Sequence, residues 1–410
     1  MNAPAQKHGP LHGVRILELS HIILGPMACE MLGDLGADVV KIEAPTGDGL
    51  RTLGATKSNI DMASLFLACN RNKRSLVLDL KNPAARKVLL NLAKSVDVVL
   101  HNNRPQVMTK LGLDYAAFKQ VNPSIIYCGA YGYSIKGPYG ERGAMDEAVQ
   151  AATGHSLLNQ HANGVARSIP TALADKTTAM TTVYAVLGAL FHRARTGRGQ
   201  EIEVPMFETL THFVMAEHQA GLTFDPPVAD ENGTAGGFAP LLRPEHKPFP
   251  TLDGYVALGP LSDAAWQTFC ARADRADLTN DPRFATAADR DRNSAAAHSE
   301  TAAVLAKAST AAWIALFDKS DVSVTRVNSL EDLMTDPHLE AVDFWKFCES
   351  PSEGTLRMPA CAMDFSETPA GIRRPPPRLG EHSFEILREL GLSENDIQAL
   401  VTEGATIQAS

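Results

Sequence analysis

Cysteine is rare in this sequence, and the few cysteines are far apart along the chain. The six cysteines among the 410 residues form no Cys-x-x-Cys pair and no cluster with histidine. A disulfide framework or a structural zinc site depends on such spacing. The thirteen histidines show no His-Glu-x-x-His motif or similar ligand spacing. We therefore expect neither a disulfide-stabilised fold nor a bound metal.

Long apolar runs and excess positive charge are also lacking. No run of about 18 apolar residues occurs, and Met1 to Pro10 has no apolar segment of the kind found in secretion signals. The formal net charge of −9 argues against a broad basic surface for nucleic acid, although it permits local basic pockets for a small polyanion. We expect a cytoplasmic protein whose partners include neither a membrane nor a nucleic acid.

The chain is longer than one ordinary hydrophobic core requires, and its 44% of apolar residues is typical of a folded globular protein. Between Gly221 and Pro250 the composition shifts towards proline, glycine and aspartate, as at a domain boundary or in a mobile loop. We expect a large domain over residues 1–225, a small α+β domain with its linkers over 226–328, and a C-terminal segment over 329–410 that returns to the large domain.

Short apolar strands alternate with helices in the first half of the chain. The order of strand, loop, helix and strand is typical of a parallel crossover. The loop at residues 21–26 lacks a G-x-G-x-x-G motif, which weakens any case for a dinucleotide site. The sequence predicts an α/β fold with a Rossmann-like sheet, with strands at 14–19, 36–42, 75–80, 97–100 and 124–128 and helices at 27–35 and 83–94.

Three loops beside these strands are candidates for ligand binding, because such sheets bind ligands beyond the carboxyl ends of their strands. They are residues 21–26, 70–74 and 101–105. In the second loop three cations stand beside two amides, which suits phosphate groups and adenine edges, and Lys110 lies beyond the third. A solvated surface loop would explain the same composition, so both interpretations stay open.

A long helix is predicted after Pro170. From Met180 onwards its apolar residues recur with the spacing of one helical face, through Tyr184 to Phe191, and we predict that this stripe is buried. Asp175 lies about 140° from Met180 around the helix, at roughly 100° per residue. We therefore expect Asp175 outside the buried stripe, on a face of small side chains.

Asp175 falls near the first turn of this helix, for which Thr171 is a candidate N-cap. The helix dipole favours an anion there, so we expect the carboxylate to stay ionised. Asp175 is a candidate nucleophile, and an acid that only stabilises a helix start is the alternative. Asp146, at the start of a shorter predicted helix, is open to the same structural interpretation.

Taken together, several stretches resemble the class III CoA-transferase family, the CaiB/BaiF type that includes formyl-CoA and carnitine CoA-transferases. The match spans nearly the whole chain, and its specificity lies in the order and spacing of its pieces. These include His21 with Gly25-Pro26, residues 33–43, residues 72–81, Asn102-x-Arg104-Pro105, Asp146 with Gln150 and Gly154, Ala174-Asp175, residues 196–206, residues 281–284, residues 336–339 and residues 379–382.

The resemblance implies a large Rossmann-like domain that binds CoA, a smaller inserted α+β domain, and a homodimer of interlocked rings. It implies that Asp175 is the nucleophile and that no cofactor is bound permanently, CoA being part of the substrate. Gly236 and Gly237 would belong to a glycine loop at the substrate. The residues implied in CoA binding are Ile23, Leu24, Asn70, Arg71, Asn72, Lys73, Asn102, Asn103, Arg104, Lys110, Gly143, Ala144, Met145 and Asp146.

The implied activity is transfer of CoA from an acyl-CoA thioester to a carboxylic acid through a covalent aspartyl intermediate. Ile23 stands where formyl-CoA transferases carry a glutamine, which argues against an oxalate and formate pair. Two alternatives stay open. One is a 2-methylacyl-CoA racemase, although Met145 replaces the histidine base of those enzymes. The other is a non-catalytic CoA-binding protein on the same fold.

Overall fold

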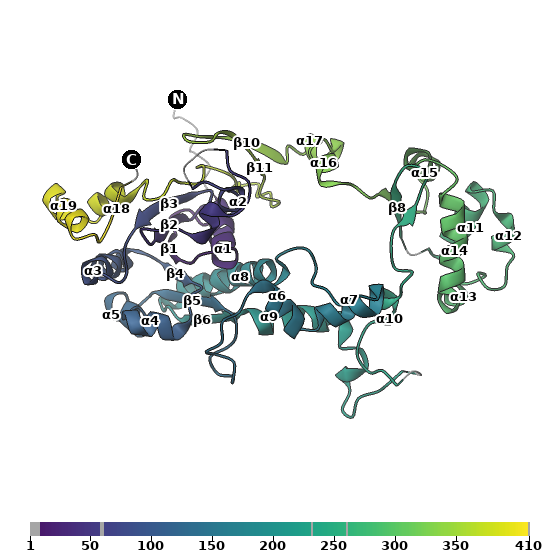
Figure 1. Cartoon of the computed structure of the whole chain (residues 1–410), viewed down its shortest axis with the longest axis horizontal. Coiled ribbons are helices and arrows are strands. Elements are labelled where there is room, and N and C mark those ends of the chain that lie inside the picture. The colour runs from purple at the N-terminus through teal and green to yellow at the C-terminus, as the bar shows by residue number, and fades with distance from the viewer. Residues whose placement is uncertain (1–8, 58–60, 231–232, 260, 409–410) are drawn as a thin grey trace. The chain divides into compact units, whose positions relative to one another are not determined.

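The computed structural model describes residues 9–57, 61–230, 233–259 and 261–408 (Figure 1). Most of the Met1 to Pro10 stretch lies outside these residues. The chain forms two compact units. The first comprises Met1–Ser156, Ser168–Ala216 and His338–Ser410, and the second comprises Leu157–Arg167 and Glu217–Pro337. The domain boundaries predicted from the sequence, and the inserted position of the smaller domain, stay predictions.

The first unit is built on a six-stranded parallel sheet, which confirms the predicted α/β class. Its strand order is β3-β2-β1-β4-β5-β6, so the direction of winding reverses between β1 and β4. Leu17 of β1 lies in register with Val40 of β2 and Val99 of β4. The strands are β1 (Arg15–Leu19), β2 (Asp38–Glu43), β3 (Lys73–Val77), β4 (Val98–His101), β5 (Ile126–Tyr131) and β6 (Glu201–Pro205).

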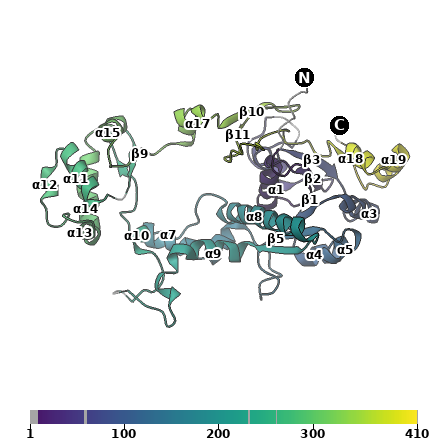
Figure 2. The same cartoon turned by 180° about the vertical axis from the view of Figure 1, so that it is seen from behind.

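Helices cover both faces of this sheet, as Figures 1 and 2 show. Successive strand residues point to opposite faces, so neighbours such as Ile16 and Leu17 are both fully buried. The face of Leu17 packs on α3 (Pro83–Leu92), α5 (Tyr115–Val121), α18 (Ser383–Glu389) and α19 (Glu394–Thr402). Two further helices, α1 (Leu24–Asp34) and α8 (Leu173–Thr196), pack against each other and against the sheet.

The buried face of α8 is not the one predicted. Met180, Tyr184 and Phe191 are 59%, 64% and 65% exposed in the single chain. The buried positions are small, because α8 packs closely on α1 and side-chain size sets how near two helices approach. They are Ala174, Thr178, Ala179, Thr182, Val186 and Ala189. Asp175 lies with Thr178 and Ala179 on the small-residue face, as predicted, but that face is the buried one, so the prediction that Asp175 lies outside the buried stripe is wrong.

The remaining elements of the first unit connect these layers and add an antiparallel hairpin of β10 and β11. They are η1 (Gly49–Thr52), α2 (Ser64–Cys69), η2 (Ala93–Ser95), α4 (Pro105–Leu111), α6 (Asp146–Ala152), α9 (Met206–His218), α17 (Pro337–Ala341), β10 (Trp345–Ser350) and β11 (Gly354–Pro359), with α7 (His155–Asn163), α9 and α17 crossing the unit boundaries.

The second unit contains a small antiparallel sheet in the order β7-β8-β9, packed with helices around aromatic residues such as Trp266, Phe269 and Trp313. Its elements are η3 (Ala220–Thr223), α10 (Ala239–Leu242), β7 (Phe249–Pro250), β8 (Tyr255–Leu258), α11 (Asp263–Arg272), α12 (Ala276–Thr279), α13 (Ala287–Arg292), α14 (Ser294–Leu305), α15 (Thr310–Phe317), β9 (Val324–Arg326) and α16 (Leu330–Leu333). Throughout the described part of the chain, every helix is too short or too polar to cross a lipid bilayer.

Candidate active site

The carboxyl ends of β1 and β4 meet where the strand order reverses, and two of the predicted loops lie there. The side chain of Asn102 fastens the loop after β1, since its Oδ1 accepts from the His21 N–H at 3.1 Å and its Nδ2 donates to the His21 carbonyl at 2.6 Å. Asn103 Nδ2 donates to the Leu19 carbonyl at 2.8 Å. The structure thus brings Asn102 and Asn103 to the loop that carries Ile23 and Leu24.

The loop before α1 is held in an uncommon conformation. Ile22 has a φ of +66°, a left-handed value that is rare for a β-branched residue and is often found near functional sites. Its N–H donates to Asp48 Oδ1 at 3.0 Å, and Asp48 is paired at 2.8 Å with the fully buried Lys41. No side chain caps α1 at Ile23. Pro26 has no N–H and the Met27 N–H donates to the Ile23 carbonyl, so in the first turn of α1 it is the N–H groups of Leu24 and Gly25 that suit an anion.

His101 is the last residue of β4 and the first of the predicted loop at residues 101–105, and no role of its own was predicted for it from the sequence. It is 2% exposed, and burial lowers its pKa to about 4, so the imidazole is neutral at physiological pH. Its Nδ1 lies 3.1 Å from the Asn103 carbonyl, and because a carbonyl only accepts, this nitrogen carries the proton. The hydrogen bond helps to shape the loop of Asn102 and Asn103.

Residues 141–146 approach the end of β5, beside the loop that follows β4. Arg104, which is exposed, donates from its guanidinium to the Glu141 carbonyl at 3.4 Å. A Cβ atom at Gly132 would lie 2.3 Å from the Ala144 Cβ, so only glycine allows this approach. Gly143, Met145 and the α4 residue Lys110 are exposed. Of the residues implied in CoA binding, those at the ends of β1, β4 and β5 therefore lie on neighbouring loops of one sheet edge.

The loop at residues 70–74, by contrast, is buried. Asn70, Arg71, Asn72 and Lys73 are 0%, 5%, 5% and 0% exposed, and β3 begins at Lys73 instead of at the predicted position 75. Lys73 pairs with Glu18 at 2.7 Å, and Arg71 pairs with Asp34 at 2.6 Å. These cations neutralise acids inside the first unit, because an unpaired buried carboxylate is very costly. Direct contact of these four side chains with CoA stays a prediction.

Asp175 is half-buried in the first turn of α8 and lies close to a second carboxylate. Its backbone N–H donates to Asp146 Oδ1 at 3.0 Å. Thr171 is not the N-cap as predicted, since α8 is preceded by Ala172 without a side-chain cap, and the Thr171 hydroxyl accepts from Lys176. Asp146, only 8% exposed, therefore performs the capping role from α6.

The expectation that Asp175 stays fully ionised is wrong. Burial, with the nearby charges of Asp146 and then Glu147, raises its pKa to about 7. The helix dipole lowers the pKa of Asp175, but the loss of water around its carboxyl group and the charges of two nearby acids raise it more. A carboxylate of raised pKa is more basic and so more nucleophilic once ionised, and such values are typical of functional sites.

This pKa predicts how stability depends on pH. Because the folded-state value lies above the unfolded value, the native state binds more protons between about pH 4 and 7, and the stabilisation present at low pH is lost as pH rises through 7. We expect Asp175→Asn to stabilise the protein by about 1–2 kcal/mol more at pH 8 than at pH 5, after discounting for partial exposure. Urea unfolding at both pH values measures this, and an equal effect at both would contradict it.

Gly236 and Gly237 belong to the second unit. The Gly237 N–H donates to the His218 carbonyl at 2.8 Å, and its φ of +96° favours glycine. Their predicted contact with substrate stays a prediction. In the described ranges, no group of three or more histidine, cysteine or acidic side chains is arranged to hold a metal ion.

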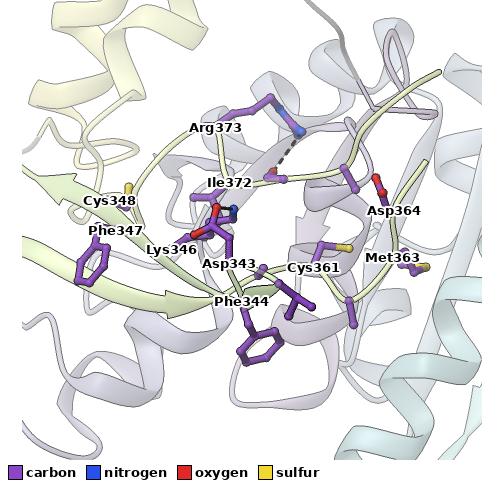
Figure 3. A pocket seen from close by; sticks show the side chains of 15 residues that line it. Asp343, Phe344, Lys346, Phe347, Cys348, Cys361, Met363, Asp364, Ile372 and Arg373 are labelled. Carbon is purple, nitrogen blue, oxygen red and sulfur yellow. Dashed lines mark hydrogen bonds and ion pairs between the residues drawn. The ribbon is translucent and has the colours of Figure 1, made fainter. Parts of the chain in front are cut away.

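A cavity of about 860 Å³ in the first unit lies elsewhere, between the β10–β11 hairpin and residues 360–373 (Figure 3). Phe344, Phe347, Cys361 and Met363 are among the side chains that line it, and Arg373 at its rim bonds to the Gly371 carbonyl. It contains none of the residues implied in catalysis or CoA binding. The pairing of the half-buried Asp175 with the buried Asp146, and not cavity size, therefore identifies the candidate site.

Comparison with known proteins shows that the chain is similar to CoA-transferases over nearly its whole length. The family model described as CoA-transferase family III matches residues 11–383. An acyl-CoA transferase of Fusarium pseudograminearum is 31% identical over 98% of this chain and 90% of its own length. A succinate–glutarate CoA-transferase of Agrobacterium fabrum is 30% identical over 93% of this chain and 96% of its own length. A crystal structure of a CAIB/BAIF family protein from Brucella suis is 29% identical, with a TM-score of 0.81 over 93% of this chain and 100% of that chain.

Proposed function

The chain belongs to CoA-transferase family III, and on this premise we propose that Asp175 carries the covalent intermediate as the enzyme moves CoA between two carboxylic acids. The observation that supports this role most is the position of Asp175, half-buried on the first turn of α8 and held beside Asp146. Such a carboxylate is poised to attack a carbonyl carbon from which bulk water is excluded.

The proposed reaction passes through four acyl transfers. An Asp175 carboxylate oxygen attacks the carbonyl carbon of the donor thioester. This attack expels CoA thiolate and forms a mixed anhydride between Asp175 and the donor acyl group. The thiolate then attacks the Asp175 carbonyl, releasing the donor acid and forming an aspartyl-CoA thioester. The acceptor carboxylate attacks this thioester and expels thiolate, giving a second anhydride. Attack of the thiolate on the acceptor's acyl carbon forms the product thioester and regenerates the Asp175 carboxylate.

Each of these steps needs donors for an oxyanion. The start of α8 and the glycine segment are the two candidate sources. At the start of α8, the Asp175 N–H is bonded to Asp146 and the Lys176 N–H to the Ala172 carbonyl. The Gly237 N–H is likewise engaged, with the His218 carbonyl at 2.8 Å, so both segments stay candidates for these donors.

For CoA itself, we propose that its anionic groups lie against the first turn of α1 and near Arg104 and Lys110. The uncapped N-terminus of α1 presents backbone N–H groups, and both cations are exposed. Residues 143–146 would line the path towards Asp175, since Asp146 bonds to its N–H.

The racemase alternative receives less support. Racemisation needs proton-transfer groups on opposite faces of one carbon. Met145 is 69% exposed and offers no base, while Asp146 is engaged as the cap of α8. Incubation of a 2-methylacyl-CoA in deuterated water separates the two activities, because only a racemase exchanges the α-proton.

We also propose a homodimer. The apolar residues exposed on α8 continue onto α9, where Phe213 is 53% exposed, and a groove of about 460 Å³ lies between Met180, Tyr184 and Phe213. A contiguous apolar face of this kind is typical of an interface. A second copy of this chain is the occupant we propose, because α8 carries the candidate nucleophile and the family resemblance implies two interlocked subunits.

The acceptor and donor acids are tested by a panel of acyl-CoA donors and free acids, with products resolved by mass spectrometry. Succinate and glutarate should be tested first, because the relative from Agrobacterium fabrum is named as a succinate–glutarate CoA-transferase. Formation of a new acyl-CoA with release of the donor acid supports the proposal. Hydrolysis alone, with every pair, would contradict it.

The raised pKa of Asp175 predicts the pH dependence of the reaction. Only the ionised carboxylate attacks, so kcat/KM should fall about thirtyfold from its plateau by pH 5.5, with a midpoint near 7. Glu147→Gln should lower the midpoint, because it removes one of the charges that raise the pKa of Asp175. Glu340→Gln, an exposed residue on α17, is the control. A profile that is flat between pH 5 and 8 would show that Asp175 does not limit the rate.

A further inference from the structure

Gln150 is a fully buried residue whose side-chain amide contacts Asp146, the hydrogen-bond partner of Asp175. No role was predicted for it from the sequence alone. It lies four residues after Asp146 on α6, so the two side chains share one face of that helix. Its Nε2 donates to Asp146 Oδ2 at 2.5 Å and to the Thr171 carbonyl at 3.0 Å. Its Oε1 accepts from the Ile169 N–H at 2.9 Å.

These bonds admit only one orientation of the amide. Both protons on Nε2 meet acceptors, and Oε1 meets a donor. Reversing the amide would place its oxygen against the Asp146 carboxylate and the Thr171 carbonyl, and its NH₂ group against the Ile169 N–H. All three hydrogen bonds would be lost, so Gln150 holds its partners in a single arrangement.

The partners of Gln150 are the two supports of the Asp175 turn. Asp146 binds the Asp175 N–H directly, and residues 169–171 lead the chain into α8. Asp146 is 8% exposed, and a buried carboxylate needs hydrogen bonds to stay in place. Without the amide, Asp146 would keep only its bond to Asp175 among the hydrogen bonds seen here.

We propose that Gln150 is a positioning residue for CoA transfer, which fixes the first turn of α8 through Asp146 and through residues 169–171. The inference rests on the proposed role of Asp175. The Gln150 amide would keep the attacking Asp175 carboxylate in one position. A displacement of that carboxylate by about 1 Å would lower the rate roughly 10²-fold.

The test uses variants of the full chain that separate hydrogen bonding from packing. Gln150→Met keeps the length of the side chain and removes all its hydrogen bonds, while Gln150→Glu keeps the acceptor but places an oxygen against Asp146. The double variant Asp146→Asn with Gln150→Glu reverses this contact. The new amide at position 146 then donates to the new carboxylate at position 150, while the amide oxygen still accepts from the Asp175 N–H. Gln398→Glu, exposed on α19, is the control.

Two readouts are needed: kcat and KM with an acyl-CoA donor, and hydrogen exchange of the amides of residues 169–177. We expect both single variants to lose about 10²-fold in kcat with KM within about threefold, and the Asp175 amide to exchange faster. The double variant should regain at least about tenfold over Gln150→Glu. The Gln398→Glu control should match the wild type in both readouts.

If Gln150 acts through packing alone, Gln150→Met should keep near wild-type kcat. That result, together with unchanged hydrogen exchange of residues 169–177, would overturn the inference but leave the proposed CoA transfer intact. A double variant no better than Gln150→Glu also overturns it, and this comparison decides if Gln150→Met fails to fold. Absence of transfer in the wild type, with any donor and acceptor, would instead remove the proposed function and this inference with it.

Discussion

Asp175→Asn is expected to lower CoA transfer by at least about 10⁴-fold while CoA binding stays within about threefold of the wild type. The amide is nearly the same size as the carboxyl, and its neutral nitrogen is a far weaker nucleophile. The predicted CoA contacts at the ends of β1 and β4 would be untouched, because they are held by Asn102 and Asn103. Steady-state kinetics and calorimetric titration with CoA measure the two effects.

Trapping experiments make the same prediction chemically. Hydroxylamine added with an acyl-CoA donor should convert the aspartyl intermediate to a hydroxamate at Asp175, found by peptide mass spectrometry. Asp318→Asn, at an exposed position in the second unit, is the matched control and should keep full turnover and labelling. Near wild-type turnover in Asp175→Asn, or a hydroxamate at another acid, would remove the assignment.

Joint replacement of Tyr184 and Phe191 by glutamate is expected to weaken self-association by at least about 10³-fold. Both side chains are more than half exposed in the single chain, so the change should cost little within one subunit. In the proposed interface each carboxylate would lose water without a partner, at about 2 kcal/mol or more apiece. Analytical ultracentrifugation over a concentration series measures the dissociation constant.

The matched control for this variant keeps the apolar surface. Tyr184→Phe with Phe191→Leu should associate within about tenfold of the wild type, because volume and hydrophobicity change little. A wild-type chain that sediments as a monomer would contradict the homodimer proposal. A glutamate double variant that still forms a dimer would place the interface on another face.

Much of the architecture could be predicted from local pattern. Apolar runs such as residues 98–100 of β4 are typical of parallel strands buried on both faces, and the alternation of strands and helices indicated the α/β fold. The position of Asp175 in the first turn of α8 was also correct, since helix starts carry local signals. The motif order pointed to the family that the comparisons show.

Tertiary contacts decided what those patterns left open. Spacing shows that α8 has an apolar face and a small-residue face, but only the close approach of α1 determines which is buried. The cations at residues 71 and 73 look like a phosphate loop until the acids of α1 and β1 are seen beside them. Likewise, the charge state of Asp175 depends on Asp146, 29 residues earlier, and on burial. The sequence alone determined the helix and its acid, whereas folding set the carboxyl group's neighbours and hence its pKa, because electrostatic effects depend on distance and solvent exposure and not on position along the chain.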